Sequence, residues 1–396
     1  MQKGRYPSLE AQIQQTKKGL STNDSAHLQV VASPYRICPI GAHVDHQGGA
    51  VLGVAIDSYT VLAFTQSPDE MVHLSSEDFE DEISFPAASV PPFANDWGRY
   101  ARGAVAALHK FYPNQIKIGF NGHIAGHLLG AGLSSSASAG VAYLMTLAKV
   151  NRLSLTDAQL VELDRLIEND YLGLNNGVQD QTTIIYGRSN SIVHQDTRNR
   201  VVTAIPHAKN IDDIAWLVIF SGYTRELTSS SFNDRVAECW EAAGQLQLGA
   251  SVLGDVTSGN YLEKKNSLPA NLQNRAAHYF SETERVEAGR EAWAAGDFKQ
   301  FGLLMNASCQ SSIYQYECGS EPLIKLHEIA SETAGVLGSR FSGGGYGGCL
   351  VALAQRKEAE QAIDTILEKY KLAFPEKASV CFGWVAQGVD GASYLS

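Results

Sequence analysis

Two glycine-rich stretches, far apart in the sequence, constrain this chain more than any other feature. The first, GAGLSSSASAG, contains Gly130 and Gly132 followed by Ser134, Ser135 and Ser136, and an apolar segment continues from it. The glycines allow a tight turn, and the segment predicts a helix over 132–151. Amides at a helix start lack intrahelical partners and lie at the positive end of the dipole, which favours an anion such as phosphate. From these residues alone, a capped helix without a ligand is the alternative.

The second stretch, GGGYGG at 343–348, includes Gly344 and precedes a predicted strand. Glycines let a backbone approach a ligand or another loop closely, although a tight turn or bulge uses them as well. The first stretch lacks the lysine of the GxxxxGK[ST] loop and does not match GxGxxG before a helix. Together the two stretches indicate a phosphate-binding protein that uses neither of those motifs.

Composition narrows the class of protein. The 396 residues suffice for two domains, and 44% hydrophobic and 18% charged residues are typical of a globular protein. A formal net charge of −11 argues against a non-specific nucleic-acid binder. We expect neither a signal peptide nor a membrane span, and the six cysteines, without a CxxC pair, indicate reduced thiols. The expected protein is cytoplasmic, a monomer or weak homo-oligomer, with a small-molecule partner and no nucleic acid or membrane.

The order of the predicted elements indicates two lobes that mix strands and helices. A new block of elements begins with the apolar strand AWLVIFSG at 215–222, so we place the lobes at 1–210 and 211–396. The other expected strands include 28–33, 51–56, 59–65 and a strand-rich stretch at 183–204, and the expected helices include 97–112, 155–173, 233–247, 284–296 and 322–334.

The stretch GAHVDHQGG at 41–49 contains two histidines, an aspartate and three glycines. Such residues suit a metal site, a general base or a polar cradle for a sugar. No further histidine or cysteine is spaced nearby as a zinc ligand, which disfavours the metal site.

Three stretches, in order, resemble the motifs of the GHMP small-molecule kinases and of their galactokinase branch. SPYRICPIGAHVDHQGG resembles the first motif, GAGLSSSASAGVA the ATP-phosphate loop and SRFSGGGYGGC the third, glycine-rich motif. YRICPIGAHVDHQGG, WGRYARGAV and DRLIENDYLGLNNGVQDQ are similar to the galacturonate kinases of that branch. The resemblance implies an α+β, two-lobed GHMP kinase fold. Its N-terminal lobe would be ribosomal-protein-S5-domain-2-like and its C-terminal lobe a ferredoxin-like α/β sandwich, with ATP and sugar in the cleft.

The resemblance also implies transfer of the ATP γ-phosphoryl group to the anomeric hydroxyl of a sugar. Asp180, in GVQDQ, matches the aspartate that faces this hydroxyl, and Arg36, in YRICP, matches the arginine paired with it. The carboxylate would take the hydroxyl proton or orient the hydroxyl, and the sequence leaves both roles open. The reaction otherwise needs alignment and charge neutralisation.

Nucleotide and Mg²⁺ residues follow from the same resemblance. Ser136 matches a serine near Mg²⁺, and Glu168 matches a metal-associated glutamate. Trp97 fits an aromatic that packs near adenine, although a tryptophan at a helix start is often a core residue. The expected ATP-binding residues are Gly130, Gly132, Ser134, Ser135, Ser136, Trp97 and Gly344.

The sugar site is implied by the 41–49 stretch. His43 and Asp45 match residues that hold the sugar in galactokinases, and Gly177 would offer a backbone N–H close to it. The resemblance therefore favours the sugar cradle, and it assigns no firm role to His46.

Ala42 stands where galactokinases have a glutamate that contacts the C6 end of galactose. That glutamate would repel a C6 carboxylate by about 1 kcal/mol in water and several times more in a shielded pocket. Ala42 therefore predicts a pocket for a uronic acid. Arg225 is the candidate donor for its carboxylate, with a solvated surface arginine as the alternative. Phe232 falls near a sugar-contacting tyrosine of galactokinases.

We therefore expect an ATP- and Mg²⁺-dependent kinase that converts D-galacturonate into D-galacturonate 1-phosphate. Kinases for galactose, glucuronate or L-arabinose are the nearest alternatives. A non-catalytic sugar and ATP sensor on the same fold is disfavoured, because the serine stretch, Arg36 and Asp180 are all intact.

Overall fold

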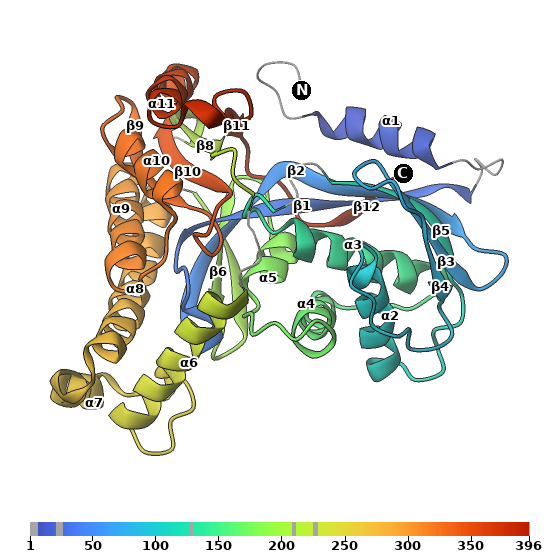
Figure 1. The fold of residues 1–396 in the computed structure, drawn as a ribbon, viewed down its shortest axis with the longest axis horizontal. Coiled ribbons are helices and arrows are strands. Elements are labelled where there is room, and N and C mark those ends of the chain that lie inside the picture. Colours follow the sequence, from blue (N-terminus) through green and yellow to red (C-terminus); the bar gives the residue numbers. More distant parts are fainter. Residues whose placement is uncertain (1–6, 21–26, 127–129, 208–210, 225–228, 396) are drawn as a thin grey trace.

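The fold consists of two sheets with helices packed on them, in two halves that meet along two long strands (Figure 1). The computed structural model describes residues 7–20, 27–126, 130–207, 211–224 and 229–395. The long strands are β1 (Gln29–Ile40) and β2 (Ala50–Gln66), which are antiparallel and span the distance between the N-terminal half and the helices of the C-terminal half. This mixed α+β architecture is the predicted one.

The first sheet has the strand order β12–β1–β2–β5–β3–β4, and β6 pairs with both β2 and β7. The second sheet has the order β11–β8–β10–β9 and is antiparallel throughout. The remaining strands of the first sheet are β3 (Met71–Ser76), β4 (Ile83–Pro86), β5 (Phe120–Gly126), β6 (Ser191–Asp196), β7 (Val201–Pro206) and β12 (Ser393–Leu395). Those of the second sheet are β8 (Ile214–Phe220), β9 (Val336–Phe341), β10 (Cys349–Gln355) and β11 (Phe382–Ala386).

The chain changes sheets between Pro206 and Ile214, near the proposed division of the lobes. At its C-terminal end the chain returns to the first sheet, where β12 pairs with β1. Lobes at 1–210 and 211–396 do not anticipate this return: the end of the second lobe completes the sheet of the first.

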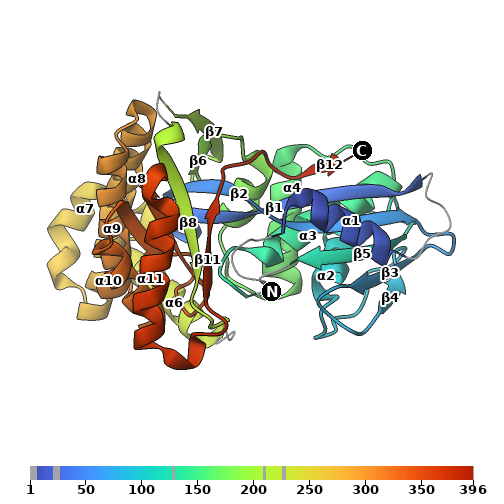
Figure 2. The same cartoon turned by 90° about the horizontal axis from the view of Figure 1, so that it is seen from above.

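The helices cover the sheets unequally. In the N-terminal half, α2 (Arg99–Phe111), α3 (Ser135–Val150), α4 (Asp157–Leu166) and α5 (Gln179–Tyr186) lie on one face of the first sheet, and α1 (Leu9–Gly19) lies on the other (Figures 1 and 2). In the C-terminal half, α8 (Ala270–Ala295) and α9 (Phe298–Tyr314) form a long pair that extends to the ends of β1 and β2. The other helices there are α6 (Ser229–Leu246), α7 (Ser258–Lys264), α10 (Glu321–Ser331) and α11 (Ala359–Ala373).

Three local predictions are corrected by the structure. Strands expected at 51–56 and 59–65 form the single strand β2, because the polar residues between them lie in a register shift opposite Pro34 and Tyr35. Residues 183–186, rich in β-branched side chains, belong to helix α5 and not to a strand. The helix expected at 284–296 begins earlier, at Ala270, because buried polar residues interrupt the apolar pattern of its first half.

Thr156 caps the start of α4, since it accepts a hydrogen bond from Gln159 N and forms a capping box. Within the described part of the chain, none of the helices combines the length and the apolar character that crossing a bilayer would demand.

Two helical glycines give a test of the packing between α9 and β9. A Cβ on Gly302 would lie 2.3 Å from the Leu337 carbonyl oxygen, whereas a Cβ on Gly244 of α6 would meet no described atom of another segment within 4 Å. Gly302→Ala is expected to lower the free energy of unfolding by about 1–3 kcal/mol. Gly244→Ala is expected to raise it by up to about 1 kcal/mol. Urea unfolding of both variants checks the pair, and effects of the same sign would contradict the packing.

Candidate active site

A cavity of about 350 Å³ lies where the first sheet, α3, α5 and the 343–348 stretch come together. Arg225 lies outside the described residues. Every other residue that the sequence analysis assigns to the site lines this one cavity: Arg36, Ala42, His43, Asp45, Trp97, Gly130, Gly132, Ser134, Ser135, Ser136, Glu168, Gly177, Asp180 and Gly344.

The two glycine-rich stretches pack directly on each other. Cys349 N donates to the Ala131 carbonyl at 2.9 Å, and a Cβ on Gly348 would lie 2.3 Å from that oxygen. Gly132 has a φ of +75°, and a Cβ there would lie 2.7 Å from the Ser342 carbonyl oxygen. These glycines therefore permit contact between the loops, while Gly344 faces the cavity.

The start of α3 faces the cavity with its amides free of a side-chain cap. Ser134 occupies the cap position with a φ of +59°, and its hydroxyl makes no cap hydrogen bond. It donates to Asp180 Oδ2 instead. Ser135 and Ser136 follow in the first turn and also line the cavity. The turn thus presents free N–H groups and hydroxyls at the positive end of a helix dipole, which suits a phosphate group.

A partly buried ion pair between Arg36 of β1 and Asp180 of α5 lies against this turn. Arg36 Nε donates to Asp180 Oδ1 at 2.8 Å, and the Arg36 side chain is only 5% exposed. Arg36 Nη1 donates to the Gly132 carbonyl at 3.0 Å and to Ser342 Oγ at 3.3 Å. Burial lowers the pKa of Arg36 and the Asp180 carboxylate raises it, with a net rise that keeps the guanidinium charged. The Asp180 carboxylate is thereby held by Arg36 on one oxygen and by Ser134 on the other.

Asp45, in the turn between β1 and β2, lies beside this pair and contacts the start of α5. Its Oδ2 accepts from Gln179 N at 3.3 Å, and a Cβ on Gly177 would lie 1.9 Å from the same oxygen. A larger residue at 177 would therefore have to displace the Asp45 carboxyl group. Burial, together with the charge of Asp180, raises the pKa of Asp45 to about 6.

His43 and His46 are held by aromatic neighbours. The His43 ring stacks on Tyr316, with centroids 4.3 Å apart, and its Nε2 lies 3.3 Å from Cys318 Sγ. His46 Nε2 lies 3.3 Å from the Tyr316 hydroxyl, and its ring meets Phe232 edge-on at 5.8 Å. Burial lowers the pKa of His46 to about 4, so it is neutral at physiological pH.

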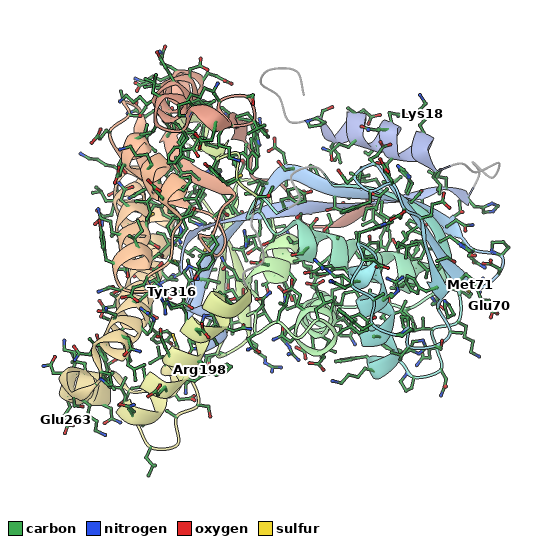
Figure 3. All side chains as sticks on the ribbon, viewed as in Figure 1. Lys18, Glu70, Met71, Arg198, Glu263 and Tyr316 are labelled. Atoms are coloured by element: carbon green, nitrogen blue, oxygen red, sulfur yellow. The ribbon has the colours of Figure 1, made fainter. Side chains whose placement is uncertain are left out.

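Tyr316 and Cys318, which follow α9, contact His43 and were not predicted from the sequence (Tyr316 is labelled in Figure 3). No spacing rule connects positions so far apart in the sequence.

Glu168 and Ser136 place a carboxylate and a hydroxyl on another wall of the cavity. Glu168 lies in a π-helical turn (Ile167–Tyr171), is 2% exposed, and accepts from Asn176 Nδ2 at 2.9 Å. Ser136 is hydrogen-bonded with Tyr100, whose pKa is raised by burial and by Glu168. The described residues contain no cluster of three or more His, Cys, Asp or Glu suited to a metal. A hydroxyl and a carboxylate fit Mg²⁺, which takes few protein ligands and keeps several waters.

Trp97 forms an aromatic wall with Phe79. Their rings are parallel, with centroids 5.4 Å apart, and both line the cavity. Trp97 Nε1 donates to the Asp81 carbonyl at 2.9 Å, and the ring also packs against the core of the N-terminal half. Trp97 therefore contacts both the cavity and the core, and its packing near adenine stays a prediction.

Comparisons with known proteins agree with this geometry. Residues 99–188 match the GHMP kinases N terminal domain, 290–372 the GHMP kinases C terminal domain, and 21–66 the galactokinase galactose-binding signature. The galacturonokinase of Arabidopsis thaliana is 40% identical, over 93% of this chain and 92% of its own. The galactokinase of Staphylococcus saprophyticus is 33% identical, over 85% of this chain and 89% of its own.

Solved structures show the same relationship. The Lactococcus lactis galactokinase, crystallised in complex with galactose, is 30% identical and gives a TM-score of 0.89, over 96% of this chain and 99% of its own. A mevalonate kinase with a TM-score of 0.65 and 14% identity shares the fold alone. The chain belongs to the GHMP kinases and is an ATP-dependent sugar kinase of the galactokinase type.

The raised pKa of Asp45 predicts a pH-dependent penalty on stability. Because its folded pKa, about 6, exceeds the ordinary value of 3.8, the folded state binds more protons than the unfolded state between these values. Stability contributed by the protonated group is therefore lost as pH rises through this window. Asp45→Asn is expected to be more stable than the wild type by about 1–2 kcal/mol at about pH 8, with no difference near about pH 4. Urea unfolding at both pH values measures this, and a variant less stable at the higher pH would contradict it.

Proposed function

We propose that the chain transfers the γ-phosphoryl group of ATP to the anomeric hydroxyl of D-galacturonate, giving D-galacturonate 1-phosphate and ADP. The observation that carries the choice of sugar is Ala42 in the wall of the cavity that also contains Asp180 and Arg36. The 40% identity to a galacturonokinase over most of both chains supports the same choice.

Ala42 leaves its part of the cavity wall without a negative charge. It lies in the same stretch as Asp45, which already places one carboxyl group in the cavity. A glutamate at 42 would add a further carboxylate to this cavity and repel a uronate by about 4 kcal/mol at the effective dielectric of a partly shielded site. An alanine removes that repulsion and leaves room for the C6 group.

We assign to Asp180 the contact with the anomeric hydroxyl, which attacks the γ-phosphoryl group of ATP. Arg36 and Ser134 fix the carboxylate from both sides, so that it accepts the hydroxyl proton or orients the hydroxyl without a search of rotamers. The start of α3 and the 343–344 backbone would hold the phosphates through N–H groups. Ser136 and Glu168 would hold Mg²⁺, which neutralises phosphate charge when bound.

Galactose is the second candidate substrate. The match of residues 21–66 to the galactokinase galactose-binding signature favours it, as do the galactokinases at 30–33% identity. Galacturonate and galactose differ only in the group at C6, so the residue at 42 is the natural place for a test.

The test compares wild type, Ala42→Glu and Ala42→Gln on D-galacturonate, D-glucuronate, D-galactose and L-arabinose, with ADP release as the measurement. We expect wild type to prefer galacturonate. Ala42→Glu should lower kcat/KM for galacturonate by about 100-fold or more, through charge repulsion. Ala42→Gln matches the glutamate in size and lacks its charge, so it should lose clearly less.

Preference of the wild type for galactose would overturn the proposed substrate. Equal losses in Ala42→Glu and Ala42→Gln would show that size, and not charge, excludes the uronate.

A further inference from the structure

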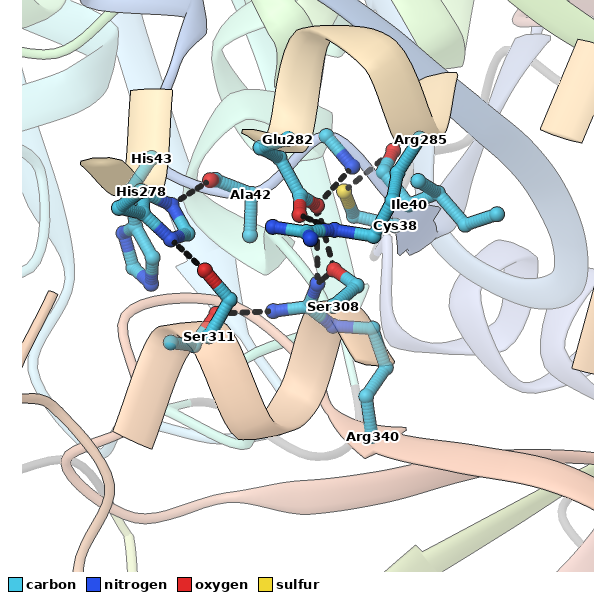
Figure 4. A network of polar contacts seen from close by, with 12 residues as sticks. Cys38, Ile40, Ala42, His43, His278, Glu282, Arg285, Ser308, Ser311 and Arg340 are labelled. Carbon is cyan, nitrogen blue, oxygen red and sulfur yellow. Dashed lines mark hydrogen bonds and ion pairs between the residues drawn. The ribbon is translucent and has the colours of Figure 1, made fainter. Parts of the chain in front are cut away.

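Helix α8 of the C-terminal half reaches the 41–43 stretch with two side chains. Gly41 N donates to Glu282 Oε1 at 2.7 Å, and His278 Nε2 lies 2.9 Å from the Ala42 carbonyl oxygen (Figure 4). His278 and Glu282 are four residues apart and therefore lie on one face of the helix. The two hydrogen bonds hold the backbone at the Gly41 amide and at the Ala42 carbonyl.

These hydrogen bonds stabilise a stretch whose backbone has positive φ values at Gly41 and His43. Gly41 has a φ of +97°, and His43, which has a Cβ, has a φ of +62°. Left-handed conformations are unfavourable for residues other than glycine and persist where surrounding contacts determine them. Gly41 is also confined, because a Cβ there would lie 2.7 Å from Val51 Cα.

Glu282 is held as an ion behind the stretch. It is fully buried, its Oε1 also accepts from the Ser308 hydroxyl, and its Oε2 accepts from Arg285 Nε at 2.6 Å. Arg340 Nη1 lies 3.8 Å from Oε1 and donates to Ser308. Burial raises the pKa of Glu282, but the charge of His278 where its ring is protonated, the charges of Arg285 and Arg340, and the Ser308 hydrogen bond outweigh it and lower the pKa. An ionised carboxylate makes a stronger hydrogen bond to the Gly41 amide than a neutral group would.

His278 is fixed as a donor at the other end. Its Nδ1 lies 2.8 Å from Ser311 Oγ, which holds the far edge of the ring. Burial lowers the pKa of His278 to about 4, so the ring is neutral at physiological pH. The Ala42 carbonyl only accepts hydrogen bonds, so Nε2 carries the proton.

We propose that His278 and Glu282 are positioning residues for the sugar. His278 and Glu282 do not line the cavity themselves. They fix Ala42 and thereby orient His43 and Asp45, which do line it. The proposal rests on the proposed function in one respect, that the 41–45 stretch contacts the sugar. It predicts that weakening either bond impairs sugar binding and leaves ATP binding intact, because the phosphate loops make no contact with these two side chains in the described hydrogen bonds.

The first set of variants tests His278. His278→Phe keeps the volume of the ring and removes the donor to Ala42, whereas His278→Gln keeps an amide donor. The matched control is His109→Phe in α2, since His109 Nε2 lies 2.8 Å from the Ala87 carbonyl and His109 does not line the cavity. KM for the sugar, KM for ATP and kcat are measured for each, on whichever sugar of the panel the wild type turns over best.

We expect His278→Phe to raise the sugar KM by about tenfold, the effect of losing one buried hydrogen bond, with the ATP KM within about threefold. His278→Gln should recover most of the sugar affinity, and His109→Phe should change neither KM. A sugar KM within twofold of wild type in His278→Phe, or equal rises in both KM values, would overturn the proposal.

The second set of variants tests Glu282. It also tests the proposal if the His278→Phe variant does not fold. Glu282→Asp keeps the charge and withdraws it from Gly41 by one methylene. Its control is Glu287→Gln on the same helix, which loses ion pairs with Arg290 and His194 outside the cavity. A sugar KM raised at least fivefold in Glu282→Asp alone supports the proposal, and an unchanged sugar KM overturns it. Because the readout uses the sugar that the wild type prefers, failure of the galacturonate assignment remains distinguishable from failure of this proposal.

Discussion

The buried contact between Arg36 and Asp180 organises the rest of the site. Arg36 comes from β1, and it reaches Asp180 in α5, the Gly132 carbonyl in the first glycine stretch and Ser342 beside the second. Removing Asp180 would leave the charge of Arg36, whose side chain is only 5% exposed, without this partner, which is destabilising. The orientation of the carboxylate is therefore tied to the packing of both glycine stretches, and the same contacts serve stability and chemistry.

The two halves of the molecule are both required for a complete site. Backbone contacts such as Cys349 N to the Ala131 carbonyl dock the glycine stretches on each other. On the other wall, Tyr316 stacks on His43 while α8 holds the backbone around Ala42. The N-terminal half thus supplies most groups that face the cavity, and the C-terminal half holds them in place.

The sequence was sufficient to predict which residues of local motifs line the cavity, and their roles stay predictions. Asp180 and Arg36 were recognisable because each lies in a short stretch, and the structure brings both into one cavity. The supporting residues were not predictable in the same way: His278 and Glu282 look like the polar side of a surface helix until their distant partners are known. The start of α8 was missed for the same reason, and the return of β12 to the first sheet depends on pairing between the two ends of the chain.

We propose that Asp180, held by Arg36 and Ser134, acts on the sugar hydroxyl. The most direct measurement is kcat of Asp180→Asn together with calorimetric affinities for sugar and ATP. We expect a kcat lower by about 10²–10⁴-fold, the usual contribution of a positioned acid–base group, with both affinities within a few-fold of wild type. A kcat within tenfold of wild type would contradict the role of Asp180.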